Sequence, residues 1–411
     1  MKGASAAVRW LAAHRTGALA LAFWAAGLAV GGHVWQLPRY FADSTTYIHW
    51  ATIRLPMYCL FVTVFGHGAG LVLAQTVLSI TAWAWLGWGV GRAAGVAVAV
   101  GLALAAPLFQ WNLCCLSESF SFSLLALLAA QTLRLLEGGG KAAFLGWALA
   151  AAAAGLTRMT NVYVLPFFAL PLLARGGRRG LPALAVAAGI YAAVAGVSAM
   201  RAQDYRRLTL TNVLMGRILP DPEARAYFAA RGMPVDDDIL AFAGKSSLTV
   251  QRELYARHPE LQRWVDADGS RVYQGWLLAD VRHVAAAWRG LLDYRLRLPG
   301  VGIGVELPGA ALRLRWAYYQ LGRIPGAAWW ALALAPLAFS LARGRRPVPS
   351  RPLLAAALAG ATLAMGFVCF HGECTEMARV MMPTGLLYRV TALVGVAAGI
   401  QAWAGRRRSG A

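Results

Sequence analysis

The chain has 411 residues, of which 59% are hydrophobic and only 14% are charged. Soluble domains are close to half apolar and a quarter charged, so this composition excludes an ordinary soluble enzyme and a disordered or fibrous protein. The 39 basic and 18 acidic residues give a formal net charge of +21, which in a soluble protein would suggest a nucleic-acid partner.

Apolar runs of about 20 residues, the length that crosses a bilayer, recur along the chain. The first run has no small-residue cleavage site, so we expect it to be a retained helix and not a removed signal peptide. The apolar stretch 52–70 is interrupted by Arg54, Pro56 and glycines, which favours an interfacial or re-entrant segment. We predict ten transmembrane helices, at about 17–36, 71–91, 94–113, 118–135, 142–157, 160–175, 181–200, 326–342, 352–370 and 384–404.

The basic residues are divided unevenly between the two predicted sides of the membrane. With a cytoplasmic N-terminus, the inner segments carry sixteen Arg and Lys residues, whereas the short outer segments carry four: Arg39, Arg54, Arg158 and Arg379. This excess follows the positive-inside rule and predicts a multi-pass protein of the inner (plasma) membrane with both termini in the cytoplasm. Because the excess charge is spread over inner loops, we expect membrane lipids and no nucleic acid as partners.

One long polar segment, residues 201–325, contains 18 basic and 13 acidic residues. Within it, 222–232 and 248–266 are predicted as short polar helices, and 272–296 as an amphipathic helix on the membrane surface. The predicted fold class is therefore an all-α polytopic membrane protein with outer juxtamembrane helices and one large extracytoplasmic loop. The predicted parts are an N-terminal transmembrane module (1–200), the extracytoplasmic loop (201–325) and C-terminal transmembrane helices (326–411).

Acidic residues are scarce outside that loop. Carboxylates near a bilayer are costly and usually face a cavity or a partner. All of them except Glu137 are predicted at outer helix ends, where Arg158, Arg379 and His371 are also expected, which indicates a functional site on the outer face. The five acidic residues are Asp43, Glu118, Glu137, Glu373 and Glu376.

Asp43 and Glu118 each have two interpretations. Either Asp43 or Ser44 caps a helix that begins at Thr45, or Asp43 is a general base that accepts a proton from an attacking hydroxyl. Glu118 either belongs to the acidic first turn of a helix capped by Ser117, or it is a second acidic group of the site. The arginines either snorkel to lipid headgroups or bind a lipid phosphate.

His371 and Glu373 lie beside Cys369 and Cys374 in the stretch FVCFHGECTEMARV. A metal site could be built from such groups, but the spacing matches no zinc pattern. A disulfide on the outer face is equally open, either within this stretch or with the adjacent cysteines at 114 and 115. We therefore predict no metal ligand, and the cysteine pairing stays undetermined.

Four fragments in chain order resemble one family. Asp43-Ser44 with Tyr47 precedes RLPMYCLFVTVFG, which runs from Arg54 to Gly66, and Gln75 follows. The other three are LSESFSFSLLALL, AAAGLTRMTNVYVLP and ARVMMPTGLL, which contain the other acidic and basic candidates. Together they resemble the GT-C superfamily of polytopic glycosyltransferases, which includes protein O-mannosyltransferases and lipid A aminoarabinose transferases.

The resemblance implies an inverting transfer of a sugar from a polyprenyl-phosphate donor to a hydroxyl of a glycan, lipid or protein acceptor outside the cytoplasmic membrane. Asp43 is followed by Ser44 where many members have a second acid, so a divalent metal is not expected. The tyrosine and second proline of the family's C-terminal pattern are Val380 and Thr384 here. The implied roles are base and second acid for Asp43 and Glu118, donor-phosphate binding for Arg158, Arg379 and His371, and substrate contacts for Tyr47, Arg54, Tyr58 and Glu373.

Two other functions remain open. A transporter or flippase of a lipid-linked or anionic substrate would use the same charged residues along a path, although transporters usually have repeats and ionisable residues near the bilayer midplane. A catalytically inactive GT-C-like assembly protein would retain the fold without the chemistry.

Overall fold

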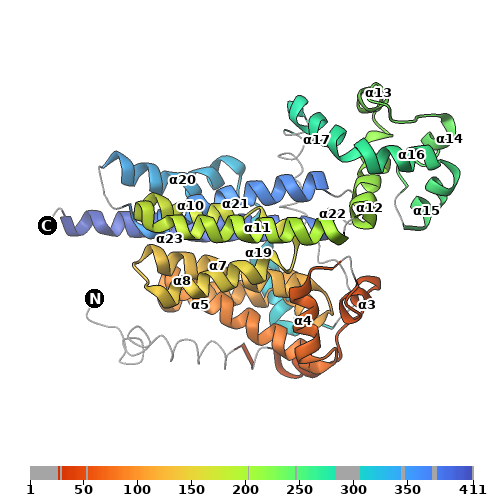
Figure 1. Cartoon of the computed structure of the whole chain (residues 1–411). Coiled ribbons are helices and arrows are strands. Elements are labelled where there is room, and N and C mark those ends of the chain that lie inside the picture. Colours follow the sequence, from red (N-terminus) through yellow and green to blue (C-terminus); the bar gives the residue numbers. More distant parts are fainter. Residues whose placement is uncertain are drawn as a thin grey trace.

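In the computed structural model, the described part of the chain is residues 26–409 without 28–29, 52–53, 202, 246–247, 283–284, 286–305, 344–347 and 373–376. Every regular element in this part is helical, and its one extended pairing is an isolated parallel bridge between Arg39 and Cys114. Long helices lie side by side as a bundle, and smaller helices form a lobe at one end of it (Figure 1). The predicted all-α class is confirmed.

Helices occupy every predicted span position from residue 71 onward, whereas most of the first predicted span lies outside the described residues. Four helices of the described part are long and apolar enough to cross a membrane, or five if α19 (Gly309–Gly322) and α20, which meet at an 81° bend, form one span. The protein is therefore a helical membrane protein, and ten spans stay a prediction. The bundle comprises α5 (Ala69–Leu104), α7 (Ser117–Leu136), α8 (Lys141–Gly155), α10 (Leu165–Gly176), α11 (Leu181–Arg201), α20 (Gly326–Ala342), α21 (Ser350–Gly372) and α23 (Met382–Ser409).

Helix α5 is a helical hairpin. Its backbone leaves the helical conformation at Gly91 and Arg92, and a Cβ added to Gly87 would lie only 2.6 Å from the carbonyl carbon of Gly95. Residues eight apart in a straight helix are separated by about 12 Å, so the chain must turn back on itself between them. The two arms correspond to the predicted spans 71–91 and 94–113, and the second continues beyond Leu104 as α6 (Ala106–Phe109) and η2 (Gln110–Leu113).

The two ends of the bundle differ in charge. The turn at Arg92 and the loops after α7 and α10 lie at the end that also holds the C-terminus (Figure 1). We call this the basic end, because Arg92, Arg134, Lys141, Arg175 and Arg351 lie at its helix ends. The opposite end, which we call the site end, carries α3 (Ala42–Ile48), α4 (Pro56–Phe65), α9 (Met159–Val162) and α22 (Met377–Val380).

Several polar groups inside the bundle are bonded within the protein, as a bilayer environment favours. The indole of Trp329 stacks on Tyr388 with ring centroids 4.7 Å apart and donates to its carbonyl oxygen at 2.8 Å. Arg389, which the sequence analysis did not single out, is fully buried and donates to the carbonyl oxygens of Tyr318 and Gly385, both at 2.8 Å. Through these contacts α23 is joined to α19 and α20.

The lobe has a hydrophobic core of its own. Phe228 packs edge-on against Trp264 and Trp276, with ring centroids 6.1 and 5.6 Å apart. Val272 and Trp276 are buried in this core, so this part of the predicted surface helix 272–296 turns its apolar side into the lobe; most of the rest lies outside the described residues. The lobe consists of α12 (Gln203–Val213), α13 (Pro222–Ala229), α14 (Asp237–Leu240), α15 (Leu248–Arg257), α16 (Pro259–Trp264) and α17 (Ser270–Ala279).

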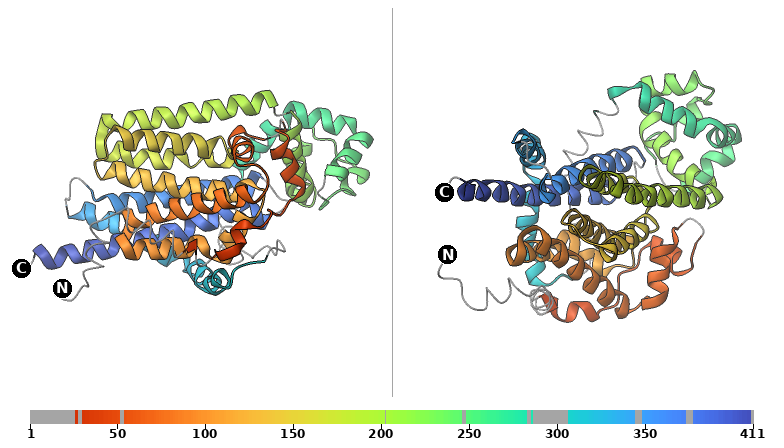
Figure 2. Two further views of the ribbon diagram at one scale, coloured as in Figure 1. Left: turned by 90° about the horizontal axis from the view of Figure 1, so that it is seen from below. Right: turned by 60° about the vertical axis from the view of Figure 1, so that its left-hand side comes forward.

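The lobe contacts the site end of the bundle through the last turns of α21 (Figure 2). The hydroxyl of Tyr273 donates to the carbonyl oxygen of His371 at 2.6 Å. The guanidinium of Arg217 lies 4.1 Å from the ring centroid of Phe370. The lobe therefore lies next to Phe370 and His371, in the last turn of α21.

Candidate functional site

Helix α3 carries the first carboxylate of the site, Asp43, in its first turn. It starts at Ala42 with Phe41 as its N-cap residue, which corrects the expected start at Thr45. The hydroxyl of Ser44 accepts from the Phe41 amide at 2.9 Å and donates to the carbonyl oxygen of Cys115 at 2.8 Å. Ser44 thus ties α3 to the turn before α7, and Asp43 does not cap the helix.

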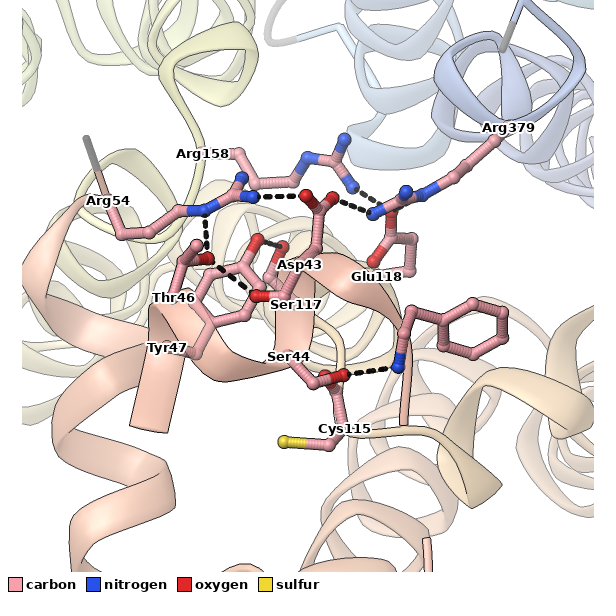
Figure 3. Close-up of polar contacts among 11 residues, drawn as sticks. Asp43, Ser44, Thr46, Tyr47, Arg54, Cys115, Ser117, Glu118, Arg158 and Arg379 are labelled. Atoms are coloured by element: carbon pink, nitrogen blue, oxygen red, sulfur yellow. Dashed lines mark hydrogen bonds and ion pairs between the residues drawn. The ribbon is translucent and has the colours of Figure 1, made fainter. Parts of the chain in front are cut away.

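The carboxylate of Asp43 lies between two arginines. Its Oδ1 is 2.6 Å from Nη2 of Arg54, and its Oδ2 accepts from Nη2 of Arg379 at 3.0 Å (Figure 3). Arg54 is itself oriented by a 2.7 Å hydrogen bond from Nε to the hydroxyl of Thr46. The Asp43 side chain remains 35% exposed, so it is accessible from outside the bundle.

Glu118, in the first turn of α7, is fully buried. Its Oε1 accepts from Nε of Arg379 at 2.6 Å and lies 3.0 Å from Nη1 of Arg158. The second contact has ion-pair distance without hydrogen-bond alignment, and Oε2 accepts no hydrogen bond from the described residues. Ser117 is not the cap, because Leu116 holds that position and the Ser117 hydroxyl bonds to that of Tyr47 at 2.9 Å.

Arg379 joins the two carboxylates. It approaches from α22 and uses Nε for Glu118 and Nη2 for Asp43 (Figure 3). A planar guanidinium with several fixed donors can make both contacts, whereas the single ammonium of a lysine could not keep this geometry. The described cluster carries a net charge of +1, because it contains two carboxylates and three arginines: Arg54, Arg158 and Arg379.

Two of the predicted substrate contacts lie beneath this cluster. Tyr47 is buried with its ring 4.6 Å under the Arg54 guanidinium, and burial raises the pKa of Tyr47, so it is neutral at physiological pH. Tyr58 is fully buried and donates to Gln75 at 3.0 Å. Tyr58 thus bonds to Gln75 beneath the cluster, and contact with a substrate by Tyr47, Tyr58 or Arg54 stays a prediction.

Gln75 connects α5 to the turn before α7. Its amide nitrogen donates to the carbonyl oxygens of Asn112 and Cys114, at 2.9 and 3.0 Å. A polar side chain in an apolar helix is a sequence signal for such a role, and Gln75 was part of the family resemblance. Thr46 and Ser117 carried no such signal, because single hydroxyl residues are common in loops and helix ends.

His371 lies in the last turn of α21, where its buried ring packs against Phe367 and Phe370 at centroid distances of 4.6 and 5.2 Å. A contact with a donor phosphate stays a prediction for this residue. Glu373, Glu376 and Cys374 lie outside the described residues. The other cysteines, Cys59, Cys114, Cys115 and Cys369, are free thiols, so none of the disulfides considered among them forms.

Within the described ranges, no group of three or more His, Cys, Asp or Glu side chains is arranged to hold a metal ion. Comparison of the chain with protein-family models, curated proteins and solved structures gives no match. The chemistry of the site therefore rests on its own residues: guanidinium groups that suit an anion, a buried carboxylate that orders them, and a partly exposed carboxylate beside them.

Proposed function

We propose that this protein is a membrane glycosyltransferase of the GT-C type, which moves a sugar from a polyprenyl-phosphate donor to an acceptor hydroxyl at the site end. The observation that carries the proposal is the double contact of Arg379, which holds buried Glu118 on one side and exposed Asp43 on the other. An anion-binding group is thereby fixed beside an accessible carboxylate, the pair that phosphate-leaving sugar transfer requires.

The donor phosphate would bind at Arg158 and Arg379. Arginine recognises phosphate through paired, charge-assisted hydrogen bonds, and the described cluster retains a net positive charge after both carboxylates are counted. A phosphate that took over Nη2 of Arg379 would release one oxygen of Asp43. Donor binding would thus prepare the base for its substrate.

Asp43 would act as the general base. The acceptor oxygen attacks the anomeric carbon from the face opposite the phosphate and passes its proton to the Asp43 carboxylate. The bond from the anomeric carbon to the phosphate oxygen breaks through an oxocarbenium-like state, and the phosphate leaves with the electron pair. Arginine neutralises the negative charge that develops on the leaving group, and the configuration at the anomeric carbon is inverted.

Glu118 would position the arginines without touching the reacting atoms. Its complete burial removes it from contact with water, and both arginines of the phosphate site converge on its Oε1. Such a buried carboxylate holds the guanidinium groups in place before the donor arrives, which lowers the reorganisation needed during transfer.

The location of the charges favours an enzyme over a transporter. The five side chains of the cluster lie together (Figure 3), and α3, α4 and α22, which carry or adjoin three of them, lie at one end of the bundle (Figure 1). Transported substrates, in contrast, usually bind near the bilayer midplane. We place this end on the extracytoplasmic side of the inner membrane, because the opposite end carries the basic loops. The lobe at the site end would then lie beside the glycan, lipid or protein acceptor.

The test is transfer by the purified protein from a panel of polyprenyl-phosphate sugars to candidate acceptors. General-base catalysis contributes about 10²- to 10⁴-fold, so Asp43→Asn should lower the transfer rate by at least about 100-fold. The matched control is Asp237→Asn, which neutralises an exposed carboxylate of the lobe and should leave the rate unchanged. Equal rates for a folded Asp43→Asn variant and the parent would reject Asp43 as the base, and donor flux across liposomes without transfer would favour the transporter.

A further inference from the structure

An apolar groove runs between the hairpin α5 and the helix α23, away from the cluster of charges. It encloses about 790 Å³, and its walls are formed mainly by hydrophobic side chains. Representative lining residues are Trp83, Leu86, Leu102, Val394 and Ala397.

The groove opens on the outer surface of the bundle. Val98, Val396 and Ile400 line it and remain 50%, 43% and 62% exposed. In a bilayer these side chains would face hydrocarbon, so an apolar chain can enter the groove from the side without passing through water.

Two arginines lie at the basic end of the groove. Arg351 donates to the carbonyl oxygen of Gly89 at 3.3 Å, and the guanidinium of Arg92 lies 5.5 Å from the ring centroid of Trp88. Neither arginine forms an ion pair with a carboxylate of the described chain. Glu137 interacts electrostatically with Arg351, so the two guanidinium groups and this one carboxylate leave a net charge of +1 at this end. A positive charge at the end of an apolar groove is complementary to an amphiphile with an anionic head and a hydrocarbon tail.

We propose that the groove binds one glycerophospholipid with a net negative headgroup. Its phosphate would bind to Arg92 and Arg351, and an acyl chain would lie along the groove toward Leu102. The site is separate from the proposed donor site: α7 alone runs 18 residues from Glu118 to Leu136, and at 1.5 Å per residue the two ends of the bundle are about 27 Å apart. The proposal therefore does not depend on sugar transfer.

The test uses the full chain in phosphatidylcholine nanodiscs, with and without phosphatidylglycerol. Native mass spectrometry should find one phosphatidylglycerol retained by the parent, and the melting temperature should be higher when that lipid is present. Both effects should be lost in the double variant Arg92→Gln with Arg351→Gln. The control is Arg343→Gln, which removes one positive charge by the same substitution at an exposed helix end outside the groove, and it should keep both effects.

A second pair of variants tests the tail. Ala397→Trp fills the groove and leaves both arginines in place, so it should abolish the retained lipid; Ala188→Trp, on an exposed side of α11, should not. The proposal is overturned if the double arginine variant keeps the lipid, if Arg343→Gln loses it equally, or if Ala397→Trp retains it. It is also overturned if inorganic phosphate alone reproduces the rise in melting temperature in phosphatidylcholine.

Discussion

The two carboxylates of the site carry the same charge in different surroundings. Glu118 is fully buried and contacts two arginines, whereas the Asp43 side chain is 35% exposed. Removing one partner of a buried ion pair leaves an uncompensated charge, but removing an exposed partner leaves a charge that water can solvate. Substitution of Glu118 should therefore mainly lower stability, whereas substitution of Asp43 should mainly lower activity.

Glu118→Gln should lower the free energy of unfolding by about 3 kcal/mol or more, because Arg158 and Arg379, whose side chains are only 19% and 16% exposed, lose the buried carboxylate that they share. Asp43→Asn should lower it by about 1 kcal/mol or less, while having the larger effect on the rate of transfer by folded protein. Unfolding by a denaturing detergent measures the first quantity. A loss of stability equal in both variants would contradict the assigned roles.

Arg379→Lys retains the positive charge but cannot contact both carboxylates and a phosphate at once. Loss of one charge-assisted hydrogen bond is worth about 1.5–3 kcal/mol, so KM for the donor should rise about tenfold or more. The comparison is Arg158→Lys, whose contact with Glu118 lacks hydrogen-bond alignment, and whose KM should rise less. Donor titrations at saturating acceptor give both values, and an unchanged KM in Arg379→Lys would remove this arginine from the donor site.

At the scale of elements, the site depends on how α5 is folded. Its hairpin returns the chain to the site end, and Gln75 on its first arm holds the turn that starts α7. Both features involve backbone atoms that pack or bond at close range. Substitutions in the hairpin or at Gln75 should therefore lower stability directly, and they should lower activity by displacing Glu118.

Gly87→Ala should destabilise the protein by about 1–3 kcal/mol, the usual cost of overpacking, because the added methyl meets the backbone of Gly95. The control is Gly101→Ala in the same helix, where the nearest atom, on Leu314, would be 3.9 Å away. That variant should be neutral or stabilised by up to about 1 kcal/mol from helix propensity. Melting temperatures in one detergent compare the two, and a tolerated Gly87→Ala would contradict the close packing of the hairpin arms.

Gln75→Leu should destabilise the protein by about 2 kcal/mol or more, because the carbonyl oxygens of Asn112 and Cys114 each lose a donor and unpaired buried groups cost about 1–3 kcal/mol. Tyr58→Phe, which removes only the donor to Gln75, should cost less. Transfer by folded Gln75→Leu should also fall, since the turn that it holds precedes Glu118. Equal stability of the two variants would show that Gln75 does not anchor this turn.

At the scale of the whole molecule, the basic loops and the candidate site lie at opposite ends of the bundle. The helix ends that carry the described basic residues lie at the end with the C-terminus, and α3 and α22, which carry Asp43 and Arg379, lie at the end next to the lobe (Figure 1). The lobe contacts the last turns of α21 through Tyr273 and Arg217. An acceptor bound by the lobe would thus lie close to the segment that carries Arg379.

This separation predicts the topology. Thr45→Cys, exposed on α3, should react with a membrane-impermeant thiol reagent in intact cells, and Ala342→Cys, exposed at the end of α20, should react only after the cells are opened. The four described native cysteines are buried, so they should give little background. Labelling of Ala342→Cys in intact cells would reverse the proposed orientation and place the site in the cytoplasm.

Hydrophobicity and periodic spacing determined the class of the protein from the sequence alone. The apolar runs predicted helices where the described structure has them, because a bilayer demands long apolar segments whatever their neighbours are. The scarcity of acidic residues also singled out Asp43 and Glu118. The helix break near Tyr163, between α9 and α10, was not foreseen, although Pro166 in the first turn of α10 is a local signal for it. The buried Arg389 was not foreseen because its contacts depend on packing against another helix.

Only the tertiary structure decided which charged residues meet. Arg379 lies 336 and 261 residues from Asp43 and Glu118 along the chain, and a local pattern contains no signal for such a distance. The tertiary structure also shows that Asp43 is partly exposed and Glu118 is buried. It shows that the Ser44 hydroxyl bonds to the N-cap residue of α3 and that Tyr58 lies beneath the site. Burial and hydrogen bonding of this kind depend on neighbours from other helices. Composition alone can therefore predict a membrane bundle, but a site is defined by the three-dimensional contacts that its side chains make.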